Sequence, residues 1–268
     1  MKLFISADIE GVSDICDWKE TTKGEEDYND FKLQLTREVN SACTGALNAG
    51  VSNIVIKDDH DSAINIMHRD LPQETTLITG WAYHPYLMME GLDNTFDASI
   101  FIGYHSAAGT NGSPLAHTMD PIKISYIKIN GEIASEFKIN YYTSLYTGVP
   151  LVLVTGDKNL CDEVKRTNSK IKTIVTKEGI GGSAVNLHPK TIEDNILNLT
   201  ETIFNSNNLT EYLETLPKEF NIEIQYSNHT DAYKASFYPG VTINKDGLTI
   251  KYKSNDYFDV LKMFLFLT

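Results

Sequence analysis

Short apolar runs alternate with longer segments of helical periodicity through residues 2–156, and this alternation limits the folds that the chain can adopt. Between the first two runs, residues 25–50 place apolar side chains three and four positions apart and end at Gly50, which predicts a helix. Strands separated by helices of this length are joined by right-handed crossovers and form a mainly parallel sheet. We therefore expect an α/β fold with a largely parallel sheet flanked by helices. The apolar runs are 2–7 (KLFISA), 52–56 (SNIVI), 98–102 (ASIFI) and 150–156 (PLVLVTG).

The pattern changes in the last third of the chain. Residues 182–204 predict a helix, 220–228 and 240–252 alternate apolar and polar residues around an Asp246-Gly247 turn, and 254–268 predict an apolar helix. Upstream, residues 124–131 predict a strand that ends at Asn130-Gly131, and 132–148 predict a helix. We expect a catalytic α/β domain over residues 1–185 and a smaller α+β C-terminal part over 186–268.

Metal-competent side chains follow three of the predicted strands. Asp8 and Glu10 follow the first strand, His60 follows the second, and His105 follows the third. Ligands of open parallel sheets bind beyond the carboxyl ends of the strands, so these side chains are expected to converge. Two carboxylates and two imidazoles suit Zn²⁺, Mn²⁺ or Co²⁺ better than Ca²⁺ or Mg²⁺. An Asp or His after one strand is usually a cap or turn residue, but three such strand ends together favour a metal site. Asp58 is a candidate to orient His60.

A nucleotide site is the obvious competitor for such a sheet, and the sequence argues against it. The first strand is followed by DIEGVSD, in which two acids precede the single glycine. A phosphate would need several glycines and free backbone N–H groups at this place. GIGGS at 179–183 is glycine-rich, but Glu178 precedes it and no Lys-Ser/Thr follows. We interpret it as a loop that leads into a helix.

Charge and cysteine content exclude further classes. The formal net charge is −13, which disfavours a nucleic-acid partner. Cys16, Cys43 and Cys161 are far apart, so neither a disulfide framework nor a thiolate zinc site is predicted. No secretion signal or membrane-spanning run is recognisable, and we expect a soluble, cytoplasmic protein without a membrane partner.

Several segments in collinear order resemble the metal-dependent D-aminopeptidases, the M55 peptidase family. They include MKLFISADIEGVS, GYHSAAGTNGSPLAHTM, INGEIASEFKINYY, TKEGIGGSAVNLHP and YPGVTI, so the resemblance covers nearly the whole chain. One departure is the stretch GIGGSA, where the family often carries a basic residue and this chain has Gly181-Gly182.

The resemblance implies a centre with two zinc ions per subunit, with Mn²⁺ or Co²⁺ as alternatives. It implies that Asp8 bridges the metals and that His117 is the catalytic histidine. The metal ligands that it implies are Asp8, Glu10, His60, His105 and Glu136. Glu136 comes from the resemblance alone, because it lies within a helical pattern. His68, His84, His188 and His229 are interpreted as bystanders.

The function that this resemblance implies is a zinc-dependent aminopeptidase that removes the N-terminal residue of short peptides, with D-residues preferred. The implied assembly is a homo-oligomer, a closed ring-shaped decamer, and the apolar stretches 81–89 and 264–268 could be buried between subunits or within the monomer core. Two alternatives stay open: a metal-dependent phosphoesterase on a similar sheet, and a non-catalytic assembly protein that keeps the fold.

Overall fold

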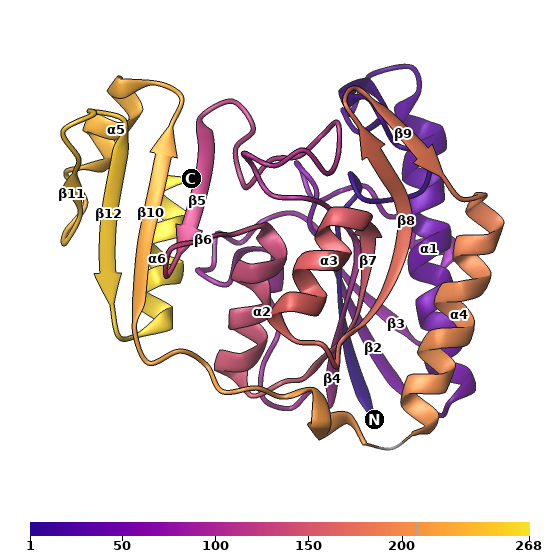
Figure 1. The fold of residues 1–268 in the computed structure, drawn as a ribbon. Coiled ribbons are helices and arrows are strands. Elements are labelled where there is room, and N and C mark those ends of the chain that lie inside the picture. The colour runs from indigo at the N-terminus through magenta and orange to yellow at the C-terminus, as the bar shows by residue number, and fades with distance from the viewer. Residues whose placement is uncertain (207) are drawn as a thin grey trace.

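In the part of the chain that the computed structural model describes, residues 1–206 and 208–268, seven strands form one sheet and five form another (Figure 1). The larger sheet has the order β3-β2-β1-β4-β7-β8-β9, and every neighbouring pair is parallel except β8 and β9. This confirms the predicted α/β class and the largely parallel sheet. The strands are β1 (Lys2–Ala7), β2 (Asn53–Asp58), β3 (Thr75–Ile78), β4 (Ala98–Tyr104), β7 (Leu151–Asp157), β8 (Lys172–Ile180) and β9 (Ser183–Asn186).

Helices cover both faces of the larger sheet (Figure 1). The helices α1 (Tyr28–Asn48) and α4 (Pro189–Asn205) pack against each other on one face, and α2 (Glu136–Thr147) and α3 (Lys158–Thr167) lie on the other. The predicted periodicity of α1 is confirmed, since Leu35, Val39 and Cys43 are all buried in the core of this sheet.

The strand order places a topological switch point between β1 and β4. From β1 the chain moves outward to β2 and β3, and it then returns to the other side of β1 as β4. At this point the backbone of Gly11 lies against the end of β4. Its amide donates a hydrogen bond to the carbonyl of Gly103 at 2.7 Å, and a Cβ on Gly11 would lie 1.7 Å from the carbonyl oxygen of Tyr104. Absence of a side chain at Gly11 therefore lets the loop after β1 lie directly on the end of β4. Crevices at such switch points are where α/β sheets bind ligands.

The smaller sheet is antiparallel and has its own core. Its order is β11-β12-β10-β5-β6, and Ile224, Ile250 and Phe264 are among the residues buried beneath it. The predicted turn at 246–247 joins the antiparallel strands β11 and β12, and the apolar C-terminal helix is also present. The elements are β5 (Ile124–Ile129), β6 (Glu132–Ile133), β10 (Phe220–Tyr226), α5 (His229–Ala235), β11 (Thr242–Ile243), β12 (Thr249–Ser254) and α6 (Tyr257–Leu267).

The two structural parts are not consecutive in the sequence. The smaller sheet takes β5 and β6 from the middle of the chain, while α4 packs on α1 beside the larger sheet. The boundary between residues 185 and 186 stays a prediction.

Three local expectations differ from the structure. GIGGS does not lead into a helix but forms the tip of the β8–β9 hairpin, since Gly179 pairs with Ala184 and Ile180 with Ser183. Residues 132–133 form the edge strand β6, so α2 begins only at Glu136, where Ser135 accepts a hydrogen bond from the amide of Lys138. The strands β3, β8 and β9 and the helices α3 and α5 were not predicted, and the helix predicted over 182–204 begins only at Pro189. Among the described residues there are also four short 3₁₀ helices: Trp18–Glu20, His68–Asp70, Leu87–Met89 and Leu209–Tyr212.

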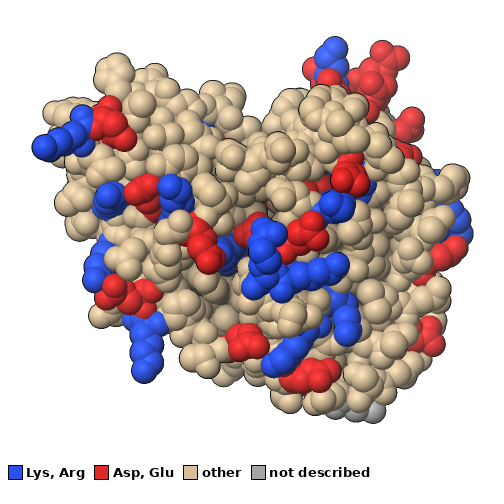
Figure 2. Space-filling view, in the orientation of Figure 1, with Lys and Arg blue, Asp and Glu red and all other residues tan. Residues whose placement is uncertain are grey.

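Acidic and basic side chains are interspersed on the face shown in Figure 2. No helix among the described residues is both long enough and apolar enough to cross a bilayer.

Candidate metal centre

The six residues singled out in the sequence lie together at the carboxyl edge of the larger sheet. They form two adjacent groups, and within each group the potential ligand atoms lie within 4.8 Å of one another. The four residues that follow predicted strands, Asp8, Glu10, His60 and His105, therefore converge in space as expected. One group is Asp8, Glu10 and His60, and the other is His105, His117 and Glu136.

Asp8 belongs to the first group, and its carboxylate also faces the second group. Its Oδ1 is 3.6 Å from Nδ1 of His60, and its Oδ2 is 3.4 Å from Nε2 of His105. Glu10 Oε1 lies 3.0 Å from the same His60 nitrogen, and Glu136 Oε2 lies 3.4 Å from the same His105 nitrogen. A carboxylate in this position can bridge two cations.

Backbone carbonyls orient the three imidazoles. Nδ1 of His105 lies 3.0 Å from the carbonyl of Ser106, Nδ1 of His117 lies 2.9 Å from that of Leu115, and Nε2 of His60 lies 2.9 Å from that of Thr21. A ring nitrogen that donates to a carbonyl carries the proton in the neutral imidazole, so the opposite nitrogen has the lone pair. In all three rings this second nitrogen faces the carboxylates, which is the arrangement a metal or a proton acceptor needs.

The residues present fit a divalent cation of the zinc type. Three buried atoms of the cluster have no hydrogen-bond partner among the described residues: Asp8 Oδ2, Glu10 Oε2 and His105 Nε2. Leaving such groups unpaired in a protein interior is costly, so they are normally satisfied by a partner or an ion. A mixed set of carboxylate oxygens and imidazole nitrogens suits Zn²⁺.

The electrostatics of the cluster indicate the same kind of ligand. Burial, followed by the neighbouring Glu10, raises the pKa of Asp8 to about 8. Burial disfavours the charged form of His105, but Glu136 and then Asp8 outweigh it and raise the pKa of this imidazole to about 10. The buried carboxylates thus require positive charge close by, which protons on the imidazoles or a bound cation can supply.

His117 differs from the other two histidines. Its ring stacks on that of His105, and its Nε2 lies 3.8 Å from Glu136 Oε1. Burial, followed by the adjacent His105, lowers its pKa below the ordinary value of 6.5. The neutral ring with a lone pair at Nε2 can accept a proton there, and the same nitrogen is also close enough to the second group to serve as a ligand.

The prediction that Asp58 orients His60 is wrong. Its carboxylate instead accepts hydrogen bonds from the amide and side chain of Asn65 and from the amide of Ile66. Asp58 therefore shapes the loop that follows His60 and does not contact the imidazole. The partner of the ring, Thr21, lies in a segment that the sequence patterns did not single out.

That segment is the turn at residues 17–22, which contacts both halves of the centre. Thr21 meets His60 through its carbonyl, and the Trp18 ring packs edge-on against His117 with 5.2 Å between ring centroids. The available sequence signal was the capping box, in which Asp17 accepts from the amide of Lys19 and Glu20 accepts from the amide of Asp17.

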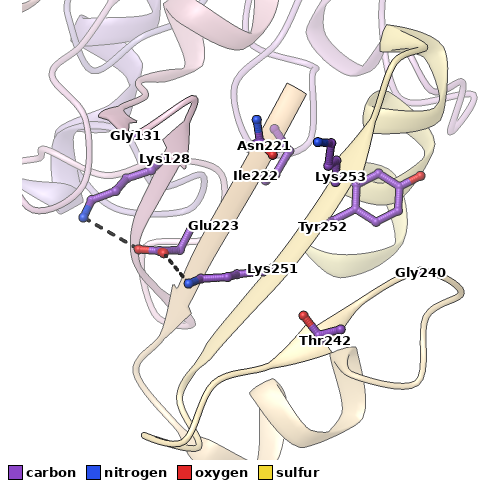
Figure 3. A pocket seen from close by; sticks show the side chains of 10 residues that line it. All are labelled: Lys128, Gly131, Asn221, Ile222, Glu223, Gly240, Thr242, Lys251, Tyr252 and Lys253. Atoms are coloured by element: carbon purple, nitrogen blue, oxygen red, sulfur yellow. Dashed lines mark ion pairs between the residues drawn. The ribbon is translucent and has the colours of Figure 1, made fainter. Parts of the chain in front are cut away.

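Other histidines and hollows lack comparable chemistry in the described part of the chain. His68, His84, His188 and His229 belong to neither metal-competent group. Figure 3 shows a hollow on the polar face of the smaller sheet, where Glu223 forms ion pairs with Lys128 at 3.6 Å and with Lys251 at 3.7 Å. The third lysine of the hollow, Lys253, pairs with Glu219 beside it at 2.8 Å, so these charges are neutralised as on an ordinary solvated face.

Comparisons with known proteins agree over the full length. The model of the M55 peptidase family, described as D-aminopeptidase, matches residues 1–266. The D-aminopeptidase of Bacillus subtilis (strain 168) is 29% identical over 269 residues, which cover 100% of this chain and 97% of that protein. The solved structure of the Zn-dependent D-aminopeptidase DppA from Bacillus subtilis, described as a self-compartmentalizing protease, matches with a TM-score of 0.91 and 27% identity. That match covers 100% of this chain and 96% of the solved chain, so the two share one fold.

Proposed function

Because the chain belongs to the M55 peptidase family of D-aminopeptidases, we propose that it is a zinc-dependent aminopeptidase that removes the N-terminal residue of short peptides, preferentially D-residues. The observation that carries this proposal is the buried cluster at the switch point of the sheet. Three of its potential metal-ligand atoms, on Asp8, Glu10 and His105, have no hydrogen-bond partner among the described residues. The printed description of DppA as Zn-dependent supports the choice of metal.

Two zinc ions would be held by the five residues named from the resemblance, with Asp8 between them. Zinc bound there would supply positive charge that polarises the scissile carbonyl and favours ionisation of a water molecule. The orientation of Asp8, with one oxygen toward each group, supports its bridging role. The other ligands in this assignment are Glu10, His60, His105 and Glu136.

His117 is assigned to proton transfer. Its Nδ1 is committed to the carbonyl of Leu115, which leaves Nε2 to take a proton from the attacking water and to deliver it to the leaving amine. The lowered pKa keeps the ring mainly neutral near pH 7, so it enters the reaction as a proton acceptor. Its place beside Glu136 and His105 brings Nε2 to the edge of the metal centre.

A phosphoesterase is less well supported. Phosphate recognition needs a basic group directed at the centre, and Lys57 is the basic residue next to the ligand-bearing loop of β2. Its ammonium is buried, donates to the carbonyls of Asp58 and Gly80, and lies 3.7 Å from Asp59. It is therefore engaged within the core. A non-catalytic assembly protein would have no need for a complete ligand set with an adjacent histidine.

We also propose that the chain forms a closed homo-oligomer, a decamer. The description of DppA as self-compartmentalizing supports an assembly of this kind. In the stretches predicted to be buried, Met88, Met89 and Phe264 lie in the monomer core, whereas Tyr83 and Phe266 remain exposed and could contact another subunit. With 30.0 kDa per chain, light scattering should give about 300 kDa, and a monomer at micromolar concentration would remove this assignment.

The enzymatic proposal is tested with a panel of dipeptides. The purified protein should hydrolyse D-Ala-D-Ala faster than L-Ala-L-Ala, lose this activity after chelation, and recover it with zinc, manganese or cobalt but not with calcium. p-Nitrophenyl phosphate serves as the competing substrate. Hydrolysis of the phosphate ester without hydrolysis of any dipeptide would replace the proposal with the phosphoesterase.

A further inference from the structure

Trp18 is a large aromatic residue that remains 40% exposed while it touches His117. We propose that Trp18 is a specificity-determining residue: its ring forms a wall for the side chain of the substrate residue that follows the scissile bond, and it favours large apolar and aromatic side chains there. This inference rests on the proposed function, because it uses the assignment of His117 to the leaving amine.

The turn that carries Trp18 is held in one conformation. Glu20 Oε2 accepts hydrogen bonds from the amides of Cys16 and Asp17, and Asp17 Oδ1 accepts one from the amide of Lys19. The acidic groups beside the ring are thus engaged with the backbone. A rigidly held aromatic face loses little conformational entropy when a ligand packs on it, which is typical of recognition surfaces.

The turn that carries Trp18 lies beside a part of the β8–β9 hairpin that carries no charged side chain. Cys16 Sγ lies 3.6 Å from the carbonyl of Gly182, so the tip of this hairpin is next to the turn (Figure 1). The tip itself, Gly181 and Gly182, carries no charge, and Ile180 before it is 61% exposed. A neutral apolar side chain can pack in such surroundings without leaving a charge unpaired.

The position of Trp18 relative to His117 decides which part of the substrate it meets. A group that delivers a proton to the leaving amine must lie within hydrogen-bond reach of that nitrogen. The residue bearing this nitrogen is the one that follows the scissile bond, and its side chain begins one atom further away. Because the Trp18 ring packs against His117 itself, it borders this residue and not the N-terminal one.

The test varies one side of the scissile bond at a time in the zinc-loaded protein. In the series D-Ala-Gly, D-Ala-D-Ala, D-Ala-D-Leu and D-Ala-D-Phe, kcat/KM should rise on the order of tenfold from Gly to Phe, as expected for packing of an apolar side chain. Trp18→Ala should flatten this series, and it should leave the ratios within the series D-Ala-Gly, D-Leu-Gly and D-Phe-Gly unchanged. Tyr233→Ala, which removes an aromatic ring that is 62% exposed on the smaller sheet part, should leave both series as in the wild type.

A binding measurement separates this inference from the proposed function. The analogue of D-Ala-D-Phe with a CH₂–NH linkage in place of the scissile amide cannot be hydrolysed, and it should change the tryptophan emission of the wild type but not of Trp18→Ala. The variant should bind this analogue about tenfold more weakly and the matching Gly analogue equally well. If no peptide is cleaved, the proposed function fails, and analogue binding still decides the role of Trp18. A flat series in the wild type, or an equal loss for all substrates in Trp18→Ala, would overturn the specificity role.

Discussion

The imidazole rings of His105 and His117 stack face to face, with 4.1 Å between their centroids and 8° between their planes. Each ring turns Nδ1 toward a backbone carbonyl, so both present Nε2 to the carboxylates. A proposed metal ligand and a proposed proton carrier are thereby held as one unit, and substitution of each histidine in turn separates their roles.

His117→Ala should keep its fold and its zinc, while kcat falls by about 10²–10⁴-fold, the usual effect of removing a positioned acid–base group. KM should change little, because the contact with His117 matters mainly as charge develops in the transition state. The measurement combines steady-state kinetics with metal analysis of the same preparation. Loss of zinc would make His117 a ligand, and near-normal kcat would make it a bystander.

His105→Ala should lose bound zinc. The substitution removes the buried Nε2 that faces both Asp8 and Glu136 and leaves these carboxylates without a shared partner. His84→Ala is the matched control, since His84 is exposed and lies outside the cluster. Metal analysis after gel filtration compares the two variants, and equal zinc content would show that the wrong histidine was assigned.

Gly11→Ala should reduce the free energy of unfolding by about 1–3 kcal/mol or more, because the new methyl group would meet the backbone of Tyr104, which cannot move aside like a flexible side chain. Gly182→Ala provides the control, since a Cβ there has no neighbour within 4 Å among the described residues. Urea denaturation measures both variants. Equal stability of the two would refute the close approach at the switch point.

Glu38 makes stability depend on pH. Burial raises its pKa above 4.5, although hydrogen bonds from Ser13 oppose this. The folded state therefore holds the proton more tightly than the unfolded state, and the stability that this provides is present below pH 4.5 and lost as the pH rises through the folded pKa.

The Glu38→Gln variant isolates this effect because the amide does not titrate. The free energy of unfolding of the wild type should fall relative to that of Glu38→Gln as the pH is raised from 4.5 to 8. Urea denaturation of both proteins at a series of pH values gives the difference. A difference that stays constant, or grows in favour of the wild type with rising pH, would contradict the assignment.

Much of the site was predictable because strand ends are marked in the sequence. Asp8, Glu10, His60 and His105 each follow an apolar run, and parallel strands bring their carboxyl ends to one edge. Glu136 lacks such a mark. Glu136 is the first residue of α2 and follows the edge strand β6, but the sequence pattern predicted a single helix over residues 132–148. Only the family resemblance therefore pointed to Glu136.

Other features depend on tertiary contacts that no local pattern encodes. The β8–β9 hairpin is one example, because the glycines at its tip are equally compatible with a loop that precedes a helix. The partner of His60 is another: Asp58, two positions before His60, was expected to orient it, yet the carbonyl of Thr21 contacts the ring instead. Trp18 was not found because it lies in a short 3₁₀ helix without an apolar pattern, and its contact with His117 spans almost one hundred positions.

The central claim is that two zinc ions at this centre are needed for peptide hydrolysis. The most direct measurement adds zinc in known increments to the metal-free protein and follows hydrolysis of D-Ala-D-Ala together with the bound metal. Activity should rise with bound zinc and reach its plateau at two ions per chain. Full activity in protein shown to contain no metal would contradict the account, and a plateau at one ion per chain would contradict its dinuclear form.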